Sequence, residues 1–475
     1  MASKSSIART GLRIATSVVV LAAGVAAVTA AASVPWPSLS TGVPTVTVTP
    51  DASDQTRVCP GTFVTVPSDA SSSSKLTSIG GSFAVVTGAS PDGTDVRVGE
   101  LATPDATGAD EKPTTLTATG ANGVLIAGSQ TQQFAGSDLV GLASAACAEP
   151  TAESWIAAGS TTTGRTSTIV LSNPTEVSAS VTLAIFSEAG PVTAPGASGI
   201  IVPANSQKSL TLAGLAPDAV SPVIHVTATG GQVLASLEQS VVRSLDPGGA
   251  DIAGPTDAPA TTHTIAGVQI VSTSAIAERA VDAASSDLPA ALRVYVPGTA
   301  GAAVSVTLKS ETLGVPDVTA SYSAVGGVVT DFPFPSLPDD TYSVTVTSDQ
   351  PVVVGARTAV VSGGTDFAWS SASPAISGTF LFATAVGPNP KLMLANSQSA
   401  DAAITLTSGS GQPVTATVAG NSATGIPLAA ATVYTVTTSA PVMAGVGYLG
   451  DGLVSAFSIS PPSPLASPVT VYPGG

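Results

Sequence analysis

The sequence predicts an all-β protein made of tandem antiparallel β-sandwich repeats, immunoglobulin-like in kind, after one N-terminal hydrophobic helix. Alternating apolar runs, bounded by Gly, Pro, Asn, Asp and Ser, follow one another along the chain, as is typical of strands and turns. Strand pairs of similar sequence recur roughly every 100 residues, and each interval has room for about seven short strands, the number in a two-sheet sandwich. The nearest approach to a helical pattern is residues 273–287, which are Ala-rich.

The composition limits the partners that the protein can have. Only 10% of the 475 residues are charged, where about 25% is usual in soluble domains, so Thr, Ser, Gly and Asn must form most of the surface. Acidic residues outnumber basic ones by 31 to 15, which gives a formal net charge of −16. Because nucleic acids bind basic patches, this surface argues against nucleic acid as a partner.

Residues 1–33 are expected to be a transmembrane anchor or a signal peptide, and the Pro-rich residues 34–50 a linker. Residues 14–32 carry no charge, and their length is near the ~20 residues that span a bilayer as a helix. The basic residues that precede them are Lys4, Arg9 and Arg13, an order that places the body of the protein outside the cell. A cleavable signal peptide has a similar layout, so a single-pass cell-membrane protein and a secreted protein are both open, and the long apolar run favours the anchor.

Internal repeats divide the rest of the chain. A strand–turn–strand pair occurs four times, as LTATGANGVLIA (116–127), VTATGGQVLA (226–235), VTVTSDQPVVV (344–354) and VYTVTTSAPVMA (433–444). A strand upstream of it occurs three times, as SVTLAIF (180–186), SVTLKS (305–310) and AITLTS (403–408). The predicted boundaries are a divergent repeat at 51–150, sandwich repeats at 151–262, 263–374 and 375–463, and a Pro-rich tail at 464–475. A propeller-like closure of the repeats is the second architecture, disfavoured because propeller blades usually have about 40–50 residues.

Cys59 and Cys147 are the two cysteines, and both lie in the first repeat. Outside the cytoplasm they are expected to form a structural disulfide, with two free buried thiols as the alternative. The loop that they close is long enough for the bond to contribute about 4–5 kcal/mol in the chain-entropy model. No metal site is predicted, because metal centres generally use more Cys and His ligands than this chain offers.

No catalytic site and no cofactor are predicted. His225 and His263 lie in different repeats or at a boundary between repeats and are interpreted as strand-edge or surface residues, whereas a catalytic triad needs converging side chains. Residues 339–340, Asp-Asp, belong to a predicted turn. Glu153 lies near Trp155 and could be imagined in a sugar cleft, but aromatic residues make up only 4% of the chain.

Two further features have both a structural and a functional interpretation. The acidic segments 90–95 and 246–251 lack the full ligand array of a calcium loop and are interpreted as turns. Trp155 and Trp369 are the possible ligand contacts. They would stack on sugars if exposed, but they are expected to pack in a core or between domains.

The order of several short motifs resembles a known family. These motifs are CPG (59–61), CAEP (147–150) followed by Trp155, LSNP (171–174), TATGGQV (227–233), LPDDTYSVTVTSDQPVVVGAR (337–357) and DFAW (366–369). The chain is similar in them to uncharacterised envelope proteins of high-GC Gram-positive bacteria, which have an N-terminal membrane segment and a domain of unknown function. The resemblance implies an extracytoplasmic, membrane-anchored role in envelope construction, and it implies no reaction.

We therefore expect a non-catalytic extracytoplasmic scaffold or interaction protein that binds other envelope proteins. The alternative is a carbohydrate-binding module, or an accessory subunit for envelope polysaccharide assembly, with cell-wall polysaccharide as its partner. Exposure of both tryptophans on one face would favour the alternative, and their burial would count against it.

Overall fold

The computed structural model describes residues 46–48, 54–66, 75–108, 111–119, 124–409, 411–461 and 469–471. The predicted N-terminal helix and membrane segment lie outside these residues. Among the helices that are described, none is long and apolar enough to cross a membrane.

The chain divides into two compact units. The first consists of residues 1–50 with 467–475, and in it β1 (Val46–Val48) pairs antiparallel with β34 (Val469–Val471). These two strands lie in the segments predicted as a linker and a tail. The second unit, residues 51–466, is called the body below.

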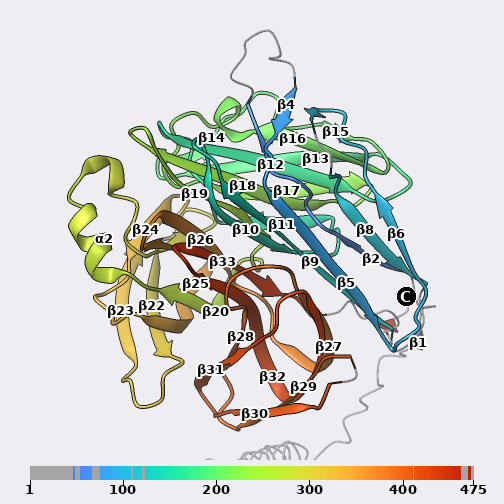
Figure 1. The fold of residues 1–475 in the computed structure, drawn as a ribbon. Coiled ribbons are helices and arrows are strands. Elements are labelled where there is room, and N and C mark those ends of the chain that lie inside the picture. Colours follow the sequence, from blue (N-terminus) through green and yellow to red (C-terminus); the bar gives the residue numbers. More distant parts are fainter. Residues whose placement is uncertain are drawn as a thin grey trace, which may run out of the picture. The chain divides into compact units, whose positions relative to one another are not determined.

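The body is all-β, as predicted (Figure 1). Its sheets are antiparallel except where β4 pairs parallel with β7. One short α-helix, α2 (Thr273–Arg279), lies in the described part of the chain, within the segment whose sequence came nearest to a helical pattern. Asp339 holds its start, because its carboxylate accepts the backbone N–H of Ser272 at 2.8 Å and of Thr273 at 3.1 Å.

The strands of the body form four groups in chain order. The first group contains β2 (Gln55–Val58), β3 (Val64–Thr65), β4 (Leu76–Ser78), β5 (Ser82–Ser90), β6 (Val96–Glu100), β7 (Ala106–Thr107), β8 (Thr114–Ala118), β9 (Leu125–Ala135) and β10 (Val140–Ala146). The second contains β11 (Glu153–Ile156), β12 (Arg165–Asn173), β13 (Ala179–Ser187), β14 (Gly190–Val192), β15 (Ile200–Val202), β16 (Ser206–Thr211), β17 (Val223–Gly230), β18 (Leu234–Arg243) and β19 (Asp246–Ala253). The third contains β20 (Ala260–Ile270), β21 (Ala291–Tyr295), β22 (Ala302–Ser310), β23 (Val318–Ala324), β24 (Val329–Pro333), β25 (Asp340–Val361) and β26 (Thr365–Ser371). The fourth contains β27 (Ile376–Thr384), β28 (Lys391–Asn396), β29 (Ala402–Thr407), β30 (Val414–Val418), β31 (Ser422–Pro427), β32 (Thr432–Gly450) and β33 (Leu453–Ile459).

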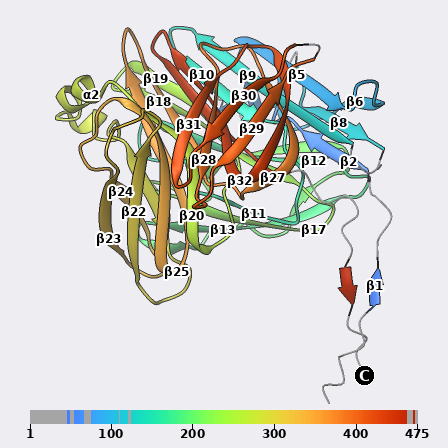
Figure 2. The same ribbon diagram turned by 90° about the horizontal axis from the view of Figure 1, so that it is seen from below.

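The third and fourth groups share one topology. Their sheets have the orders β23-β22-β25-β21-β24 and β30-β29-β32-β28-β31. In the third group the first half of β25 pairs with β20 and β22, and the second half pairs with β21 and β26, as can be followed in Figure 2 for β20, β22 and β25. One long strand therefore passes from one sheet of the group to the other, and β32 does the same in the fourth group.

The recurring sequences occupy equivalent places in these groups. The strand pair found by sequence lies in β25 and β32, and in the second group it forms the successive strands β17 and β18. The upstream strand is β13 in the second group, β22 in the third and β29 in the fourth. β13 pairs with β17, β22 with the first half of β25, and β29 with the first half of β32. Alternate side chains point into the core, as a strand requires: Val344 and Val346 in β25 are fully buried.

The last strands of the four groups, β10, β19, β26 and β33, are called the axial strands below. β10 packs on β19 and β33, and β26 packs on the same two strands, so that the four form a closed ring. Figure 1 shows their labels together in the middle of the body. The four groups are thus arranged cyclically, and this closure brings parts of the chain that are hundreds of residues apart into contact.

Candidate functional site

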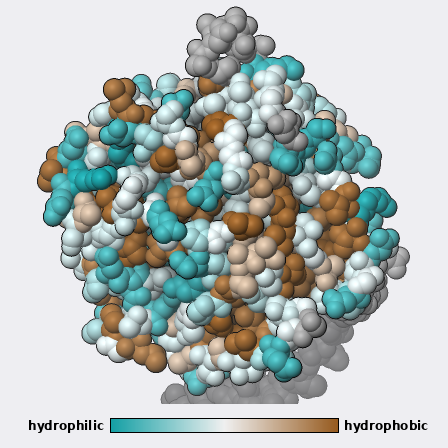
Figure 3. Space-filling view, in the orientation of Figure 1, coloured by the Kyte–Doolittle hydropathy of each residue, from teal (hydrophilic) through white to brown (hydrophobic). Residues whose placement is uncertain are grey.

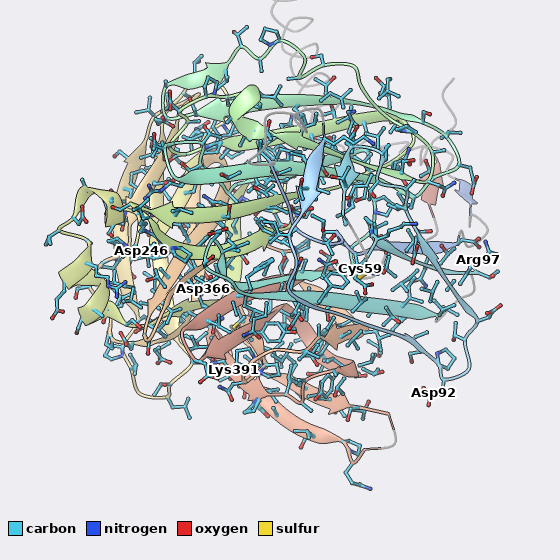
Figure 4. The ribbon with its side chains drawn as sticks, turned by 45° about the horizontal axis from the view of Figure 1, so that its top comes forward. Cys59, Asp92, Arg97, Asp246, Asp366 and Lys391 are labelled. Atoms are coloured by element: carbon cyan, nitrogen blue, oxygen red, sulfur yellow. A yellow bond between two sulfur atoms is a disulfide. The ribbon has the colours of Figure 1, made fainter. Side chains whose placement is uncertain are left out.

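A buried carboxylate lies where the axial strands meet. Asp366, in β26, is fully buried, and Figure 4 shows it in the interior of the body. Its Oδ2 accepts the backbone N–H of Leu142 in β10 at 3.0 Å and of Val454 in β33 at 3.1 Å. Its Oδ1 accepts the N–H of Ala250 in β19 at 3.2 Å. One side chain of the third group thus holds the backbone of the other three groups, and we call it the axial clamp.

Two glycines make room for the axial clamp. A Cβ at Gly141 would lie 2.5 Å from Oδ1 of Asp366, and a Cβ at Gly249 would lie 2.7 Å from the same atom. Their φ angles, +128° and +116°, are also ones that other residues rarely adopt. The segment 246–251, which was predicted to be a turn, is instead part of β19, because its glycines let the strand pass close to a carboxylate.

A second buried carboxylate extends the network. Oδ2 of Asp251, in β19, accepts the backbone N–H of Trp369 at 2.7 Å, and Oδ1 accepts the Ser455 hydroxyl at 3.0 Å. Oγ of Ser455 lies 2.7 Å from Oγ of Ser144, so this network also includes a residue from each of the four groups. The Nε1–H of Trp369 donates to Gln239 at 2.7 Å. With 3% of its surface exposed, Trp369 belongs to the junction between groups.

The protonation of these acids is set mainly by burial. Burial raises the pKa of Asp251 to about 8 and raises that of Asp366 well above its usual range, while the hydrogen bonds that they accept oppose the change. Burial also raises the pKa of Glu238, in β18, to about 8, and Oε2 of this residue accepts the N–H of Val64 in β3 at 2.8 Å.

A buried arginine of the third group connects this group with the second. The buried guanidinium of Arg293, in β21, contacts Asp331 in β24 at 2.8 and 2.9 Å. It also donates to the carbonyl oxygens of Gly159 and Pro222 in the second group, and it lies 4.6 Å from the ring centre of Trp369. The guanidinium lowers the pKa of Asp331 to about 2 against the opposing effect of burial. A charge this deeply buried is tolerated because each of its donors has a partner.

A cavity of about 520 Å³, the axial cavity, lies at the carboxyl ends of the axial strands. The segments that follow these strands contribute to its wall, at 145–149, 252–258, 371–374 and 456–461. A proline closes the same short pattern after each axial strand: Ala148-Glu-Pro150, Ala253-Gly-Pro255, Ala372-Ser-Pro374 and Ile459-Ser-Pro461. Because proline cannot donate a ladder hydrogen bond, it prevents each axial strand, which ends two to four residues earlier, from continuing as a paired strand through this position. This repeated pattern is a signal in the sequence that the predicted repeats, which rest on strand pairs, do not include.

Trp155 lines the axial cavity but is only 7% exposed. Its ring stacks on that of His225, with centroids 4.0 Å apart and an angle of 7° between the planes. Nε2 of His225 is 2.8 Å from Oε1 of Glu153, which also lines the cavity. Both predicted ligand-contact tryptophans therefore line this cavity, and neither forms an exposed stacking platform.

Asp257 and His263 form a second pair beside the axial cavity. Asp257 lines the cavity, and its Oδ2 lies 4.0 Å from Nδ1 of His263. His263, interpreted from the sequence as a strand-edge or surface residue, is 2% exposed and so does not lie at the surface, because β20 passes through the interior, against β25. Nε2 of His263 is 2.7 Å from the carbonyl oxygen of Val352, which can only accept, so Nε2 carries the proton. Burial raises the pKa of Asp257 to about 6 and lowers that of His263.

The predicted disulfide is confirmed. Cys59 and Cys147 are bonded, with an S–S distance of 1.97 Å, and both are buried. Cys147 directly follows β10 and lines the axial cavity, so the disulfide fastens part of the cavity wall to the first group.

The other acidic candidates have local partners. Asp339 holds the start of α2, and Asp340 accepts hydrogen bonds from Ser310 and from the N–H of Thr341. The segment 90–95 connects β5 with β6. In the part of the chain that the structure describes, no group of three or more His, Cys, Asp or Glu side chains is placed to hold a metal ion.

Comparison with known proteins identifies a family. Residues 102–431 match DUF5719, which is described as a family of unknown function. Because the match covers more than half of the chain, the protein belongs to this family. A search of curated proteins found no match.

Proposed function

We propose that this member of the DUF5719 family is a non-catalytic extracytoplasmic scaffold of the bacterial cell envelope. The observation that supports the proposal most directly is the axial clamp, in which Asp366 joins the backbones of all four groups. A scaffold must hold its binding surfaces at fixed positions, and a buried polar network whose members have partners makes a structure rigid.

An extracytoplasmic location is part of the proposal. The bond between Cys59 and Cys147 supports it, since structural disulfides form and persist in oxidising compartments and are rare in the cytosol. We further propose that residues 14–32 anchor the protein in the cytoplasmic membrane of a high-GC Gram-positive bacterium, with the body outside. The uncharged run and the basic residues before it support this orientation.

Exposed sheet edges offer surfaces for protein partners. β23 and β30 are the terminal strands in their sheet orders, and their sequences, VTASYSA and VTATV, contain no charge. An open edge without charges or proline is suited to pairing with a strand of another protein. On the face shown in Figure 3, hydrophobic residues lie among hydrophilic ones, a mixture that fits contact with partners of several kinds.

The experiment is an affinity pull-down with the full chain from detergent-solubilised envelope, run in parallel with purified cell-wall polysaccharide. We expect the native chain to retain specific envelope proteins. A variant with Thr319→Lys in β23 and Thr415→Lys in β30 should lose them, because charges on an edge oppose strand pairing. A control with Ser399→Lys, in an exposed turn of the fourth group, should retain them. Retention of polysaccharide without any protein would overturn the scaffold proposal.

The second candidate is a carbohydrate-binding module or an accessory subunit for polysaccharide assembly. The axial cavity supports it, because acidic and aromatic side chains meet there, Glu153 and Trp155 among them. The burial of Trp155 and Trp369 counts against it, since sugar-binding aromatics present an exposed ring face.

A further inference from the structure

The axial cavity has the size and construction of a small-molecule site. Its volume of about 520 Å³ lies within the range of roughly 300–1,000 Å³ that is usual for ligand pockets. All four groups contribute to its wall, and the axial clamp and the disulfide hold the strands that form it. Such a cavity is formed before a ligand arrives, which lowers the entropy that binding must overcome.

The wall is apolar over much of its area. Leu234, Ile252, Leu381 and Phe382 line it, together with several alanines. A ligand that fills the cavity must therefore present hydrocarbon to these side chains, because an unpaired polar group there would lose its hydration.

The charges that line the cavity are predominantly negative. Its ionisable residues are Arg57, Glu149, Glu153 and Asp257. Arg57 is already paired with Glu149 at 3.1 Å, which leaves the carboxylates of Glu153 and Asp257. Glu153 lies beside His225, but Asp257 accepts no hydrogen bond from any residue that the structure describes.

The imidazole of His263, beside Asp257, does not donate a hydrogen bond to its carboxylate. Nδ1 of His263 lies 4.0 Å from Oδ2 of Asp257, which is beyond hydrogen-bond distance. Because the proton of His263 is on Nε2, where it serves Val352, the neutral ring offers Asp257 only a lone pair. The carboxylate, 24% exposed, is thus open to a donor from the cavity side.

We propose that the axial cavity binds a small amphipathic amine, whose ammonium group donates to the Asp257 carboxylate while its hydrocarbon part packs on the apolar wall. This binding activity goes beyond the scaffold role, and either can fail without the other. An ammonium group matches the surplus negative charge and the missing donor, whereas a carboxylate ligand would add a like charge at the same place.

Nitroxide quenching of tryptophan fluorescence tests the proposal. The probes are 4-amino-TEMPO, 4-hydroxy-TEMPO and 4-carboxy-TEMPO, which share one hydrocarbon body and differ in charge. The chain has three tryptophans, of which Trp155 and Trp369 line the cavity. The full chain with Trp36→Phe therefore reports on these two. We expect saturable quenching by the amine at a concentration about tenfold or more below that of the carboxylate, the usual effect of a hydrogen bond to a charged group.

Two variants locate the site. Asp257→Asn should remove the preference for the amine, while the matched Asp218→Asn, at an exposed turn position, should keep it. Ser458→Phe, which places a large side chain on the cavity wall, should abolish saturable quenching, while Ser399→Phe in an exposed turn should not. Far-ultraviolet circular dichroism establishes that each variant is folded. If one is not, the probe series on the parent chain still decides, because equal and unsaturable quenching by all three probes would overturn the proposal.

Discussion

Removal of the axial clamp should destabilise the body far more than removal of an exposed acid. In the Asp366→Ala variant, the backbone N–H groups of Leu142, Ala250 and Val454 lose their acceptor. An unsatisfied buried donor costs about 1–3 kcal/mol, so three of them cost about 3–9 kcal/mol. Relief of the desolvation that raises the pKa of Asp366, and entry of water into the space, offset part of this. We therefore expect the free energy of unfolding to fall by about 3 kcal/mol.

The assay is equilibrium unfolding of the full chain in urea, followed by circular dichroism and by tryptophan fluorescence. In the native chain, the unfolding transitions seen by circular dichroism and by fluorescence should coincide. Loss of Asp366 should separate them, because groups that are no longer held together unfold individually. The matched control is Asp349→Ala in the same strand group, where an exposed carboxylate accepts one N–H, that of Ala303. It should cost about 0.5 kcal/mol and leave the transitions coincident. A loss at Asp366 no larger than that of the control would refute the reasoning.

Three further predictions concern the same junctions. Gly141→Ala should lower the midpoint of thermal unfolding more than Gly363→Ala. Both positions have positive φ, but only a Cβ at position 141 would lie 2.5 Å from Oδ1 of Asp366. Equal shifts would show that backbone strain alone, and not the contact with Asp366, determines the loss. Arg293→Met should cost about 3–5 kcal/mol at neutral pH, because it leaves the largely buried Asp331 carboxylate with the Ser221 hydroxyl but without the guanidinium. It should also remove the part of the stability that the native chain loses as pH falls from about 4 to about 2, the range set by the lowered pKa of Asp331, and an unchanged loss of stability in acid would contradict this. Asp251 has a raised pKa, of about 8, so its contribution to stability is complete below its unfolded pKa, near 4, and is lost as pH rises towards 8. Between pH 5 and 8, the free energy of unfolding in urea should therefore decline less for Asp251→Asn than for the native chain. An equal decline would argue against this role of Asp251.

The fold class could be predicted because it depends on local signals. Alternation along each strand and the turn residues between strands are visible within ten residues, and the repeated strand pairs mark equivalent elements such as β25 and β32. The disulfide was also predictable, because the chain has only two cysteines.

The candidate site could not be predicted because it depends on contacts between distant residues. Asp366 and Leu142 are 224 positions apart, and nothing near either residue in the sequence indicates the other. His263 was interpreted as a strand-edge or surface residue because it lies at the boundary between two predicted repeats, whereas the pairing of β20 with β25 buries it. The prolines that follow the axial strands, Pro150, Pro255, Pro374 and Pro461, were the available signal, since each lies within four residues of the end of its strand.

Hydrogen exchange at the axial amides tests the central claim, that the four groups form one rigid body. The amides of Leu142, Ala250 and Val454 belong to three groups and share one acceptor in the fourth. In the native full chain, peptides that contain them should exchange only through global unfolding, all with the same free energy of opening. Exchange of one of these peptides at a much lower free energy than the others would mean that its group opens alone, and would contradict the claim.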